Sequence, residues 1–166
     1  MKPSKMRLFL AAAACAASLQ ASAQATPNAN YTDMWWVGLA ENGWGISFIQ
    51  HPSNQSFAVL YHYDPLTPEG STPDSADFKP LWVVMPGGTW TSPTRFTGPV
   101  YVTSGVPFFQ SGSNPVTNEV GTFTFNFTDL NNGIFTYNIQ GSDVPGSPAF
   151  GLPAASGAKN ITRQNF

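Results

Sequence analysis

The stretch that decides the fold is residues 121–140, GTFTFNFTDLNNGIFTYNIQ. In its first half Phe123, Phe125 and Phe127 alternate with polar residues, which is the period-two pattern of a strand with one buried face. Residues 129–133, Asp-Leu-Asn-Asn-Gly, have the composition of a hairpin connection, and the alternation resumes after them. The stretch therefore predicts two antiparallel strands with a polar outer face.

Similar short runs occur along the rest of the chain, separated by Gly, Pro, Asn and Ser. The alternating run 56–64 puts Phe57, Val59, Tyr61 and Tyr63 on one face. Further strands are expected near 34–37, 46–50, 81–85, 94–103 and 159–164.

About eight strands joined mainly by sequential hairpins predict an all-β antiparallel meander. It is expected to close into a small barrel or, alternatively, to form a two-sheet sandwich. Asn42-Gly43 is a hairpin-type turn signal, and Gly98-Pro99 predicts a bulge or bend within its strand. Good helix formers are scarce after the N-terminus, so no helix of note is expected.

Residues 1–23 are predicted to be a removable export signal. A positively charged start is followed by the apolar run 8–17 and by the small-x-small site Ala21-Ser22-Ala23. About ten apolar residues are too few to cross a hydrocarbon core of about 30 Å, so no membrane span is expected. The chain is therefore expected to be secreted or periplasmic, the alternative being a lipoprotein anchored at Cys15.

Charge and cysteine content narrow the function classes further. The only cysteine lies inside the predicted signal, so disulfides, thiol catalysis and cysteine metal sites are excluded from the mature chain, and no cofactor or metal is predicted. Beyond residue 23 there are four basic residues against nine acids, a net charge of −5, which argues against a nucleic-acid partner. Residues 24–33 are expected to form a flexible leader, and residues 34–166 a single monomeric domain.

Several runs of the chain, taken in order, resemble a Trp-rich module of secreted bacterial proteins. That module occurs alone, in tandem or appended to exported hydrolases, and the resemblance implies a secreted β module without carrying over any functional residue. The runs are Met34-Trp35-Trp36, Glu41-x-Gly43-Trp44-Gly45-Ile46, Phe57-Ala58-Val59-Leu60-Tyr61-x-Tyr63-Asp64, Pro80-Leu81-Trp82, Phe96-x-Gly98-x-Val100-Tyr101, Val120-Gly121-x-Phe123-x-Phe125-x-Phe127-x-Asp129 and Ile161-Thr162-Arg163.

The first candidate function is a non-catalytic binding module for a carbohydrate or a small apolar ligand. Adjacent Trp35 and Trp36 must point to opposite sides of a strand, so one of them faces away from the interior. An exposed indole can stack on a sugar ring while neighbouring polar groups bind hydroxyls. The predicted site is an aromatic cleft at one end of the sheet, formed by Trp35 or Trp36 with Trp44 and Trp82, with polar contacts from Glu41, Asn42, Tyr61 and Arg95.

Two other classes stay open. A structural adaptor or an inhibitor of an extracellular enzyme, with another extracellular protein as partner, is compatible with the acidic loop 65–79. A hydrolase could use Glu41 with Asp64 as paired carboxylates, or His62 as a base. Arg95 is also expected to pair with Glu41 or Asp64. Exposure of the five tryptophans is the observation that best separates a binding surface from a core.

Overall fold

The computed structural model describes residues 24–64, 80–112 and 115–166, and this part of the chain is all-β. Its one helical element is a 3₁₀ turn, η1 (Leu39–Glu41). The predicted signal with Cys15 and the acidic loop 65–79 lie outside the described residues. The strands are β1 (Asp33–Trp36), β2 (Gly45–Gln50), β3 (Ser56–Tyr63), β4 (Pro80–Met85), β5 (Thr89–Ser92), β6 (Arg95–Ser104), β7 (Val116–Phe127), β8 (Asn132–Ile139) and β9 (Ala155–Arg163).

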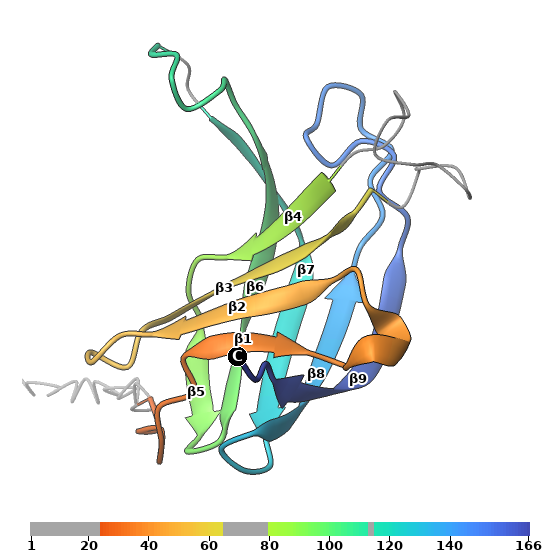
Figure 1. Ribbon diagram of the computed structural model, residues 1–166. Coiled ribbons are helices and arrows are strands. Elements are labelled where there is room, and N and C mark those ends of the chain that lie inside the picture. The colour runs from red at the N-terminus through yellow and green to blue at the C-terminus, as the bar shows by residue number, and fades with distance from the viewer. Residues whose placement is uncertain (1–23, 65–79, 113–114) are drawn as a thin grey trace, which may run out of the picture.

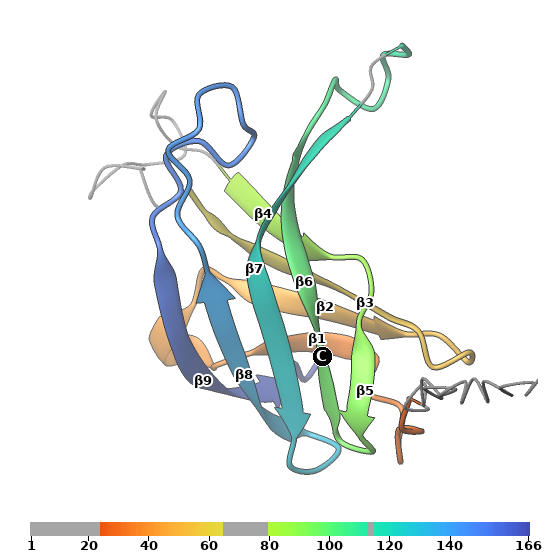
Figure 2. The ribbon, with the colours of Figure 1, turned by 180° about the vertical axis from the view of Figure 1, so that it is seen from behind.

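Eight of these strands form a closed antiparallel barrel (Figures 1 and 2). Their order is β4-β3-β2-β1-β9-β8-β7-β6, and Val84 of β4 pairs with Tyr101 of β6 to complete the ring. Strand β5 lies outside the ring, along β6. The predicted small barrel is confirmed, and the sandwich alternative is not adopted. Closure leaves few exposed strand edges, which suits a chain with few charges to protect them.

Aromatic side chains fill one end of the barrel. Phe123, Phe125 and Phe127 all point inward, as their alternation predicts, while Thr124 between them is half-buried and Asn126 is exposed. Tyr31 and Phe127 stack with ring centroids 3.9 Å apart and planes 5° apart. Trp35 packs against Phe127 as well, with centroids 5.0 Å apart. Each such ring buries about 150–250 Å² of surface. The cluster therefore provides a large apolar core, which small domains that rely on disulfides lack.

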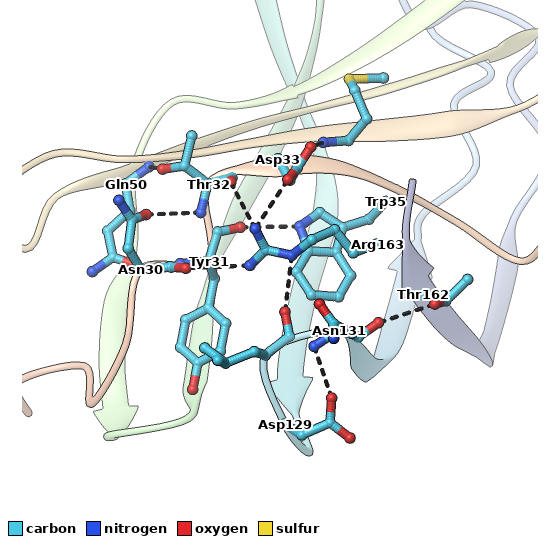
Figure 3. A network of polar contacts seen from close by, with 12 residues as sticks. Asn30, Tyr31, Thr32, Asp33, Trp35, Gln50, Asp129, Asn131, Thr162 and Arg163 are labelled. Atoms are coloured by element: carbon cyan, nitrogen blue, oxygen red, sulfur yellow. Dashed lines mark hydrogen bonds and ion pairs between the residues drawn. The ribbon is translucent and has the colours of Figure 1, made fainter. Parts of the chain in front are cut away.

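Arg163 of β9 fastens the first strand to the last (Figure 3). Its Nη1 donates to Asp33 Oδ2 at 2.9 Å and its Nε donates to the Leu130 carbonyl at 2.9 Å. Its Nη2 donates to the Asn30 carbonyl at 3.2 Å, and its Cζ lies 5.3 Å from the centre of the Trp35 ring. One guanidinium therefore joins β1, the segment before it and the β7–β8 hairpin.

The segment expected to be a flexible leader lies against the barrel. The Ala25 amide donates to the Trp90 carbonyl at 2.9 Å, and the Asn28 amide donates to the Pro93 carbonyl at 3.0 Å. The Tyr31 side chain is only 2 % exposed and belongs to the core.

Glycine explains a close crossing at the end of β4. A Cβ added to Gly98 would lie 2.3 Å from the Gly87 carbonyl oxygen and 2.8 Å from the Gly88 Cα. The connection from β4 to β5 thus crosses β6 at a residue without a side chain. The register shift between β6 and β7 falls later, between Val100 and Tyr101, so the bulge predicted at Gly98 is displaced along the strand.

Candidate binding site

Strand alternation sorts the tryptophans between two faces. Trp35 and Trp90 are 0 % and 1 % exposed, so their rings belong to the core. Trp82 is 49 % exposed on the outer face of β4, and Trp36 follows the inward Trp35 on β1. Trp44 precedes β2 and is half-buried, with its ring 6.4 Å from that of Phe135. Trp35 and Trp36 therefore take opposite sides, as a strand requires.

The outer face of β1, β2 and β3 carries a hollow of about 410 Å³, which we call the outer groove. Gly45 of β2 pairs with Tyr61 of β3, and Trp35 pairs with Ile46, so continuation of that register sets Trp36 beside Gly45. The residues that line the outer groove are Met34, Trp35, Trp36, Asn42, Gly43, Trp44, Gly45, Tyr61 and Gln164.

Gly45 forms the floor of the outer groove because it has no side chain to fill the space between its neighbours. A Cβ built there would meet the Trp35 carbonyl oxygen at 3.6 Å and the Met34 Cε at 3.9 Å, which are ordinary contacts. A side chain at position 45 would therefore fit without a clash, and its absence leaves the space over the backbone of Gly45 open. The strand register sets Trp36 of β1 on one side of Gly45 and Tyr61 of β3 on the other.

The aromatic surface continues past the groove. Tyr61, 46 % exposed, pairs across the sheet with Trp82. Side chains directly opposite one another on antiparallel strands lie within about 5 Å at Cβ, so these two rings form adjacent surface. Asn42 and Gln164 add amide groups at the groove. Flat rings beside amide donors and acceptors can stack on one face of a ligand and hydrogen-bond its hydroxyls.

Glu41 has a partner within the protein. Lys159 Nζ donates to Glu41 Oε2 at 2.6 Å, and this hydrogen bond lowers the pKa of Glu41, with the Trp44 indole acting the same way. Glu41 is thus paired with Lys159 and not with Arg95. Arg95 was expected to pair with Glu41 or Asp64, and the pairing with Glu41 is wrong. Arg95 is exposed at the start of β6, beside the β5–β6 turn, and does not line the outer groove.

His62 lies on the inner face of β3 and is among the residues that line a second hollow, inside the barrel. Burial lowers the pKa of His62, while the Tyr63 backbone and the Asp64 carboxylate act in the opposite direction. We call this hollow of about 230 Å³ the inner cavity; it is lined by Trp44, Leu60, His62, Val83, Phe123, Phe135, Tyr137, Ile139, Leu152, Pro153, Ala155 and Lys159. Within residues 24–64, 80–112 and 115–166, no cluster of three His, Cys, Asp or Glu could hold a metal ion.

The structure thus brings together five of the eight predicted site residues around the outer groove. They are Trp35, which is buried, with Trp36, Asn42, Trp44 and Tyr61. Trp82 adjoins the groove through Tyr61, whereas Glu41 pairs with Lys159 and Arg95 lies elsewhere. Gln164 and the inner cavity were not predicted, because the first comes from the far end of the chain and the second from seven separate segments.

In the described part of the chain no helix is long and apolar enough to cross a membrane. Comparison of this chain with models of known protein families, with curated proteins and with solved structures finds no match.

Proposed function

We propose that this protein is an exported, non-catalytic binding module and that its outer groove binds carbohydrate. The observation that carries the proposal is the row Trp36, Gly45, Tyr61 and Trp82 on the outer face of β1 to β4. A glycine between large rings leaves a slot whose two sides are aromatic. Because these side chains lie on the outer face of the sheet, they do not pack in the core of the barrel.

Carbohydrate suits this surface because a sugar ring has an apolar face and a polar edge. The apolar C–H face can stack on Tyr61 or Trp82, and the hydroxyls at the edge can reach the amides of Asn42 and Gln164. All three rings stand on strands of a closed barrel, so little conformational freedom is lost when a ligand stacks on them. Pre-organisation of this sort favours binding at modest contact area.

Titration with soluble hexasaccharides tests the proposal. A panel of gluco-, xylo-, manno- and chito-hexaose is added to the mature protein, and binding is followed by calorimetry and tryptophan fluorescence. Loss of one stacking ring is expected to remove about 1–1.5 kcal/mol, so Tyr61→Ala and Trp82→Ala should each weaken binding by about 5–13-fold.

Two further variants sharpen the test. Gly45→Val fills the slot without removing any ring and should abolish binding while the barrel stays folded, since the added Cβ meets only ordinary contacts. Phe108→Ala is the matched control, because that ring is 99 % exposed in the β6–β7 connection and away from the groove. The absence of saturable binding across the panel, or equal weakening by Phe108→Ala, would contradict the proposal.

A further inference from the structure

The inward-facing side chains of two strands lose burial along the strand, which marks where the barrel interior is not filled. On β8 Phe135 is 2 % exposed, whereas Tyr137 and Ile139 beyond it are only half-buried. On β3 Ala58 is fully buried, whereas Leu60 beyond it is half-buried. Tyr137, Ile139 and Leu60 all line the inner cavity, so part of their apolar surface faces that space instead of a packed neighbour.

The polar atoms of the residues that line the inner cavity are used elsewhere or shielded. Nε2 of His62 has almost no accessible surface, so it presents no acceptor to the cavity. Nζ of Lys159 donates to Glu41 Oε2 at 2.6 Å, so this residue contributes its aliphatic stem to the wall. Among the residues that the structure describes, almost no polar atom is therefore exposed on the wall.

A wall of this chemistry selects against ligands that need hydrogen bonds. A hydroxyl or amide placed in the inner cavity would lose its bonds to water and gain none from the protein. An anion would have to compete with Glu41 for Lys159, whereas an uncharged ligand leaves that ion pair intact. Water is held poorly as well, since a buried water molecule needs about two to four polar partners.

The size and the rings of the cavity define its occupant further. An apolar cavity of about 150 Å³ is enough to take up benzene, so a cavity of about 230 Å³ has room for roughly nine non-hydrogen atoms. The rings of Phe123 and Phe135 on its wall meet edge to face with centroids 4.8 Å apart. Such a wall favours an aromatic group, because ring–ring contacts add to simple burial.

We infer that the inner cavity is a second binding site, separate from the outer groove, for a small uncharged aromatic hydrocarbon without hydrogen-bonding groups. This site lies inside the barrel, while the groove lies on its outer face, and the two select opposite chemistry. Binding at the cavity does not rest on carbohydrate binding at the groove, and failure of either one leaves the other intact.

Two probes of equal size test the inference. n-Propylbenzene and 2-phenylethanol each have nine non-hydrogen atoms and differ by a hydroxyl in place of the terminal methyl group. Calorimetry on the mature protein is expected to show one saturable site for n-propylbenzene, with at least about 10-fold weaker binding of 2-phenylethanol. From benzene to n-propylbenzene, affinity should rise about fourfold for each added carbon. No saturable binding of n-propylbenzene, or equal affinity for the two probes, overturns the inference.

Two neighbouring residues of β3 separate the two sites. Leu60→Trp adds a ring that fills the inner cavity and should abolish n-propylbenzene binding, with the fold checked by circular dichroism. Tyr61→Ala is the matched control: it alters the next residue, on the outer face, and should leave n-propylbenzene affinity unchanged within twofold. Retained binding in a folded Leu60→Trp variant, or loss of binding in Tyr61→Ala, would place the ligand outside the cavity and contradict the inference.

A further measurement needs no variant. In ¹³C methyl spectra of the wild-type protein, the ring current of bound n-propylbenzene should shift the methyl resonances of Leu60, Val83 and Ile139, which line the cavity. The methyl resonances of Val102 in the core and of Leu130 in the β7–β8 hairpin should stay in place, since neither residue lines it. Shifts of equal size at all five residues would indicate non-specific association and overturn the inference.

Discussion

Trp35 and Trp82 offer a direct contrast between a core indole and a surface indole. Trp35 is 0 % exposed, and its Nε1 donates to the Tyr31 carbonyl at 3.0 Å. Its side chain removes roughly 200 Å² of apolar surface from water, which at about 25 cal/mol per Å² corresponds to about 5 kcal/mol. The usual cost of Trp→Ala in a core is about 3–5 kcal/mol, and the unpaired Tyr31 carbonyl adds about 1 kcal/mol. We expect Trp35→Ala to lower the free energy of unfolding by about 4–5 kcal/mol.

Trp82→Ala is expected to cost far less. Half of its surface is already in water, so the same arithmetic gives at most about 2.5 kcal/mol. Because the ring lies on the outside of the barrel, its removal leaves open surface rather than a closed cavity, and no cavity term is added. A loss of about 1–2 kcal/mol follows.

Urea unfolding followed by far-ultraviolet circular dichroism measures both values, because the midpoint and slope of the transition are read within each variant and do not require equal signal amplitudes. Equal m-values across the series would show that the variants expose the same surface on unfolding. Trp35→Phe keeps most of the apolar volume and provides a folded variant if the alanine form is unfolded at 25 °C. The reasoning is refuted if Trp82→Ala destabilises as much as Trp35→Ala, because the outer ring would then be structural rather than available to a ligand.

Three further predictions concern the scaffold. Gly98→Ala should destabilise by about 1–3 kcal/mol in urea because its Cβ would strike backbone atoms, whereas Gly87→Ala, with no atom within 4 Å of the added Cβ, should be neutral. Since the folded-state pKa of Glu41 is lowered below its ordinary value of 4.5, its stabilisation is complete above the unfolded pKa and is lost as the pH falls through the folded one. The difference in urea midpoint between wild type and Glu41→Gln should therefore be constant at neutral pH and shrink as the pH falls below 4.5. Arg163→Ala should cost about 2–4 kcal/mol by calorimetric unfolding, against less than about 0.5 kcal/mol for the exposed Arg95→Ala. Equal losses would contradict the stabilising role assigned to the hydrogen bonds of Arg163.

The side-chain alternation was predictable from the sequence because it is local. The Phe123, Phe125 and Phe127 series has a period of two, and a strand allows only one assignment of such a series to the buried face. The same rule separated Trp35 from Trp36. The polar composition of residues 24–33, in contrast, concealed that Tyr31 is a core residue, since one ring among polar neighbours has no periodicity to reveal it.

Contacts between distant parts of the chain could not be predicted from a single sequence. Lys159 and Glu41 are 118 residues apart, and nothing local distinguishes that lysine from Arg95 as the partner of the carboxylate. Gln164 reaches the outer groove only because β9 lies next to β1. The inner cavity exists only because the barrel closes. Leu60 and His62 on the inner face of β3 do not indicate a cavity by themselves, since the strands that form its opposite wall lie far away in the sequence.

Ring closure between β1 and β9 has a kinetic consequence. Asp33 and Arg163 are 130 residues apart, so among the strand pairs of the described fold β1 and β9 close the longest loop. A growing chain presents β1 with one edge unpaired until the final strand has been synthesised, and the Trp35 ring lacks its guanidinium cover for the same interval. The loop-closure entropy of such remote pairings slows folding, to roughly milliseconds to seconds in all-β domains. The complete barrel is therefore expected to form after translation of β9, with the hairpins of each half preceding it.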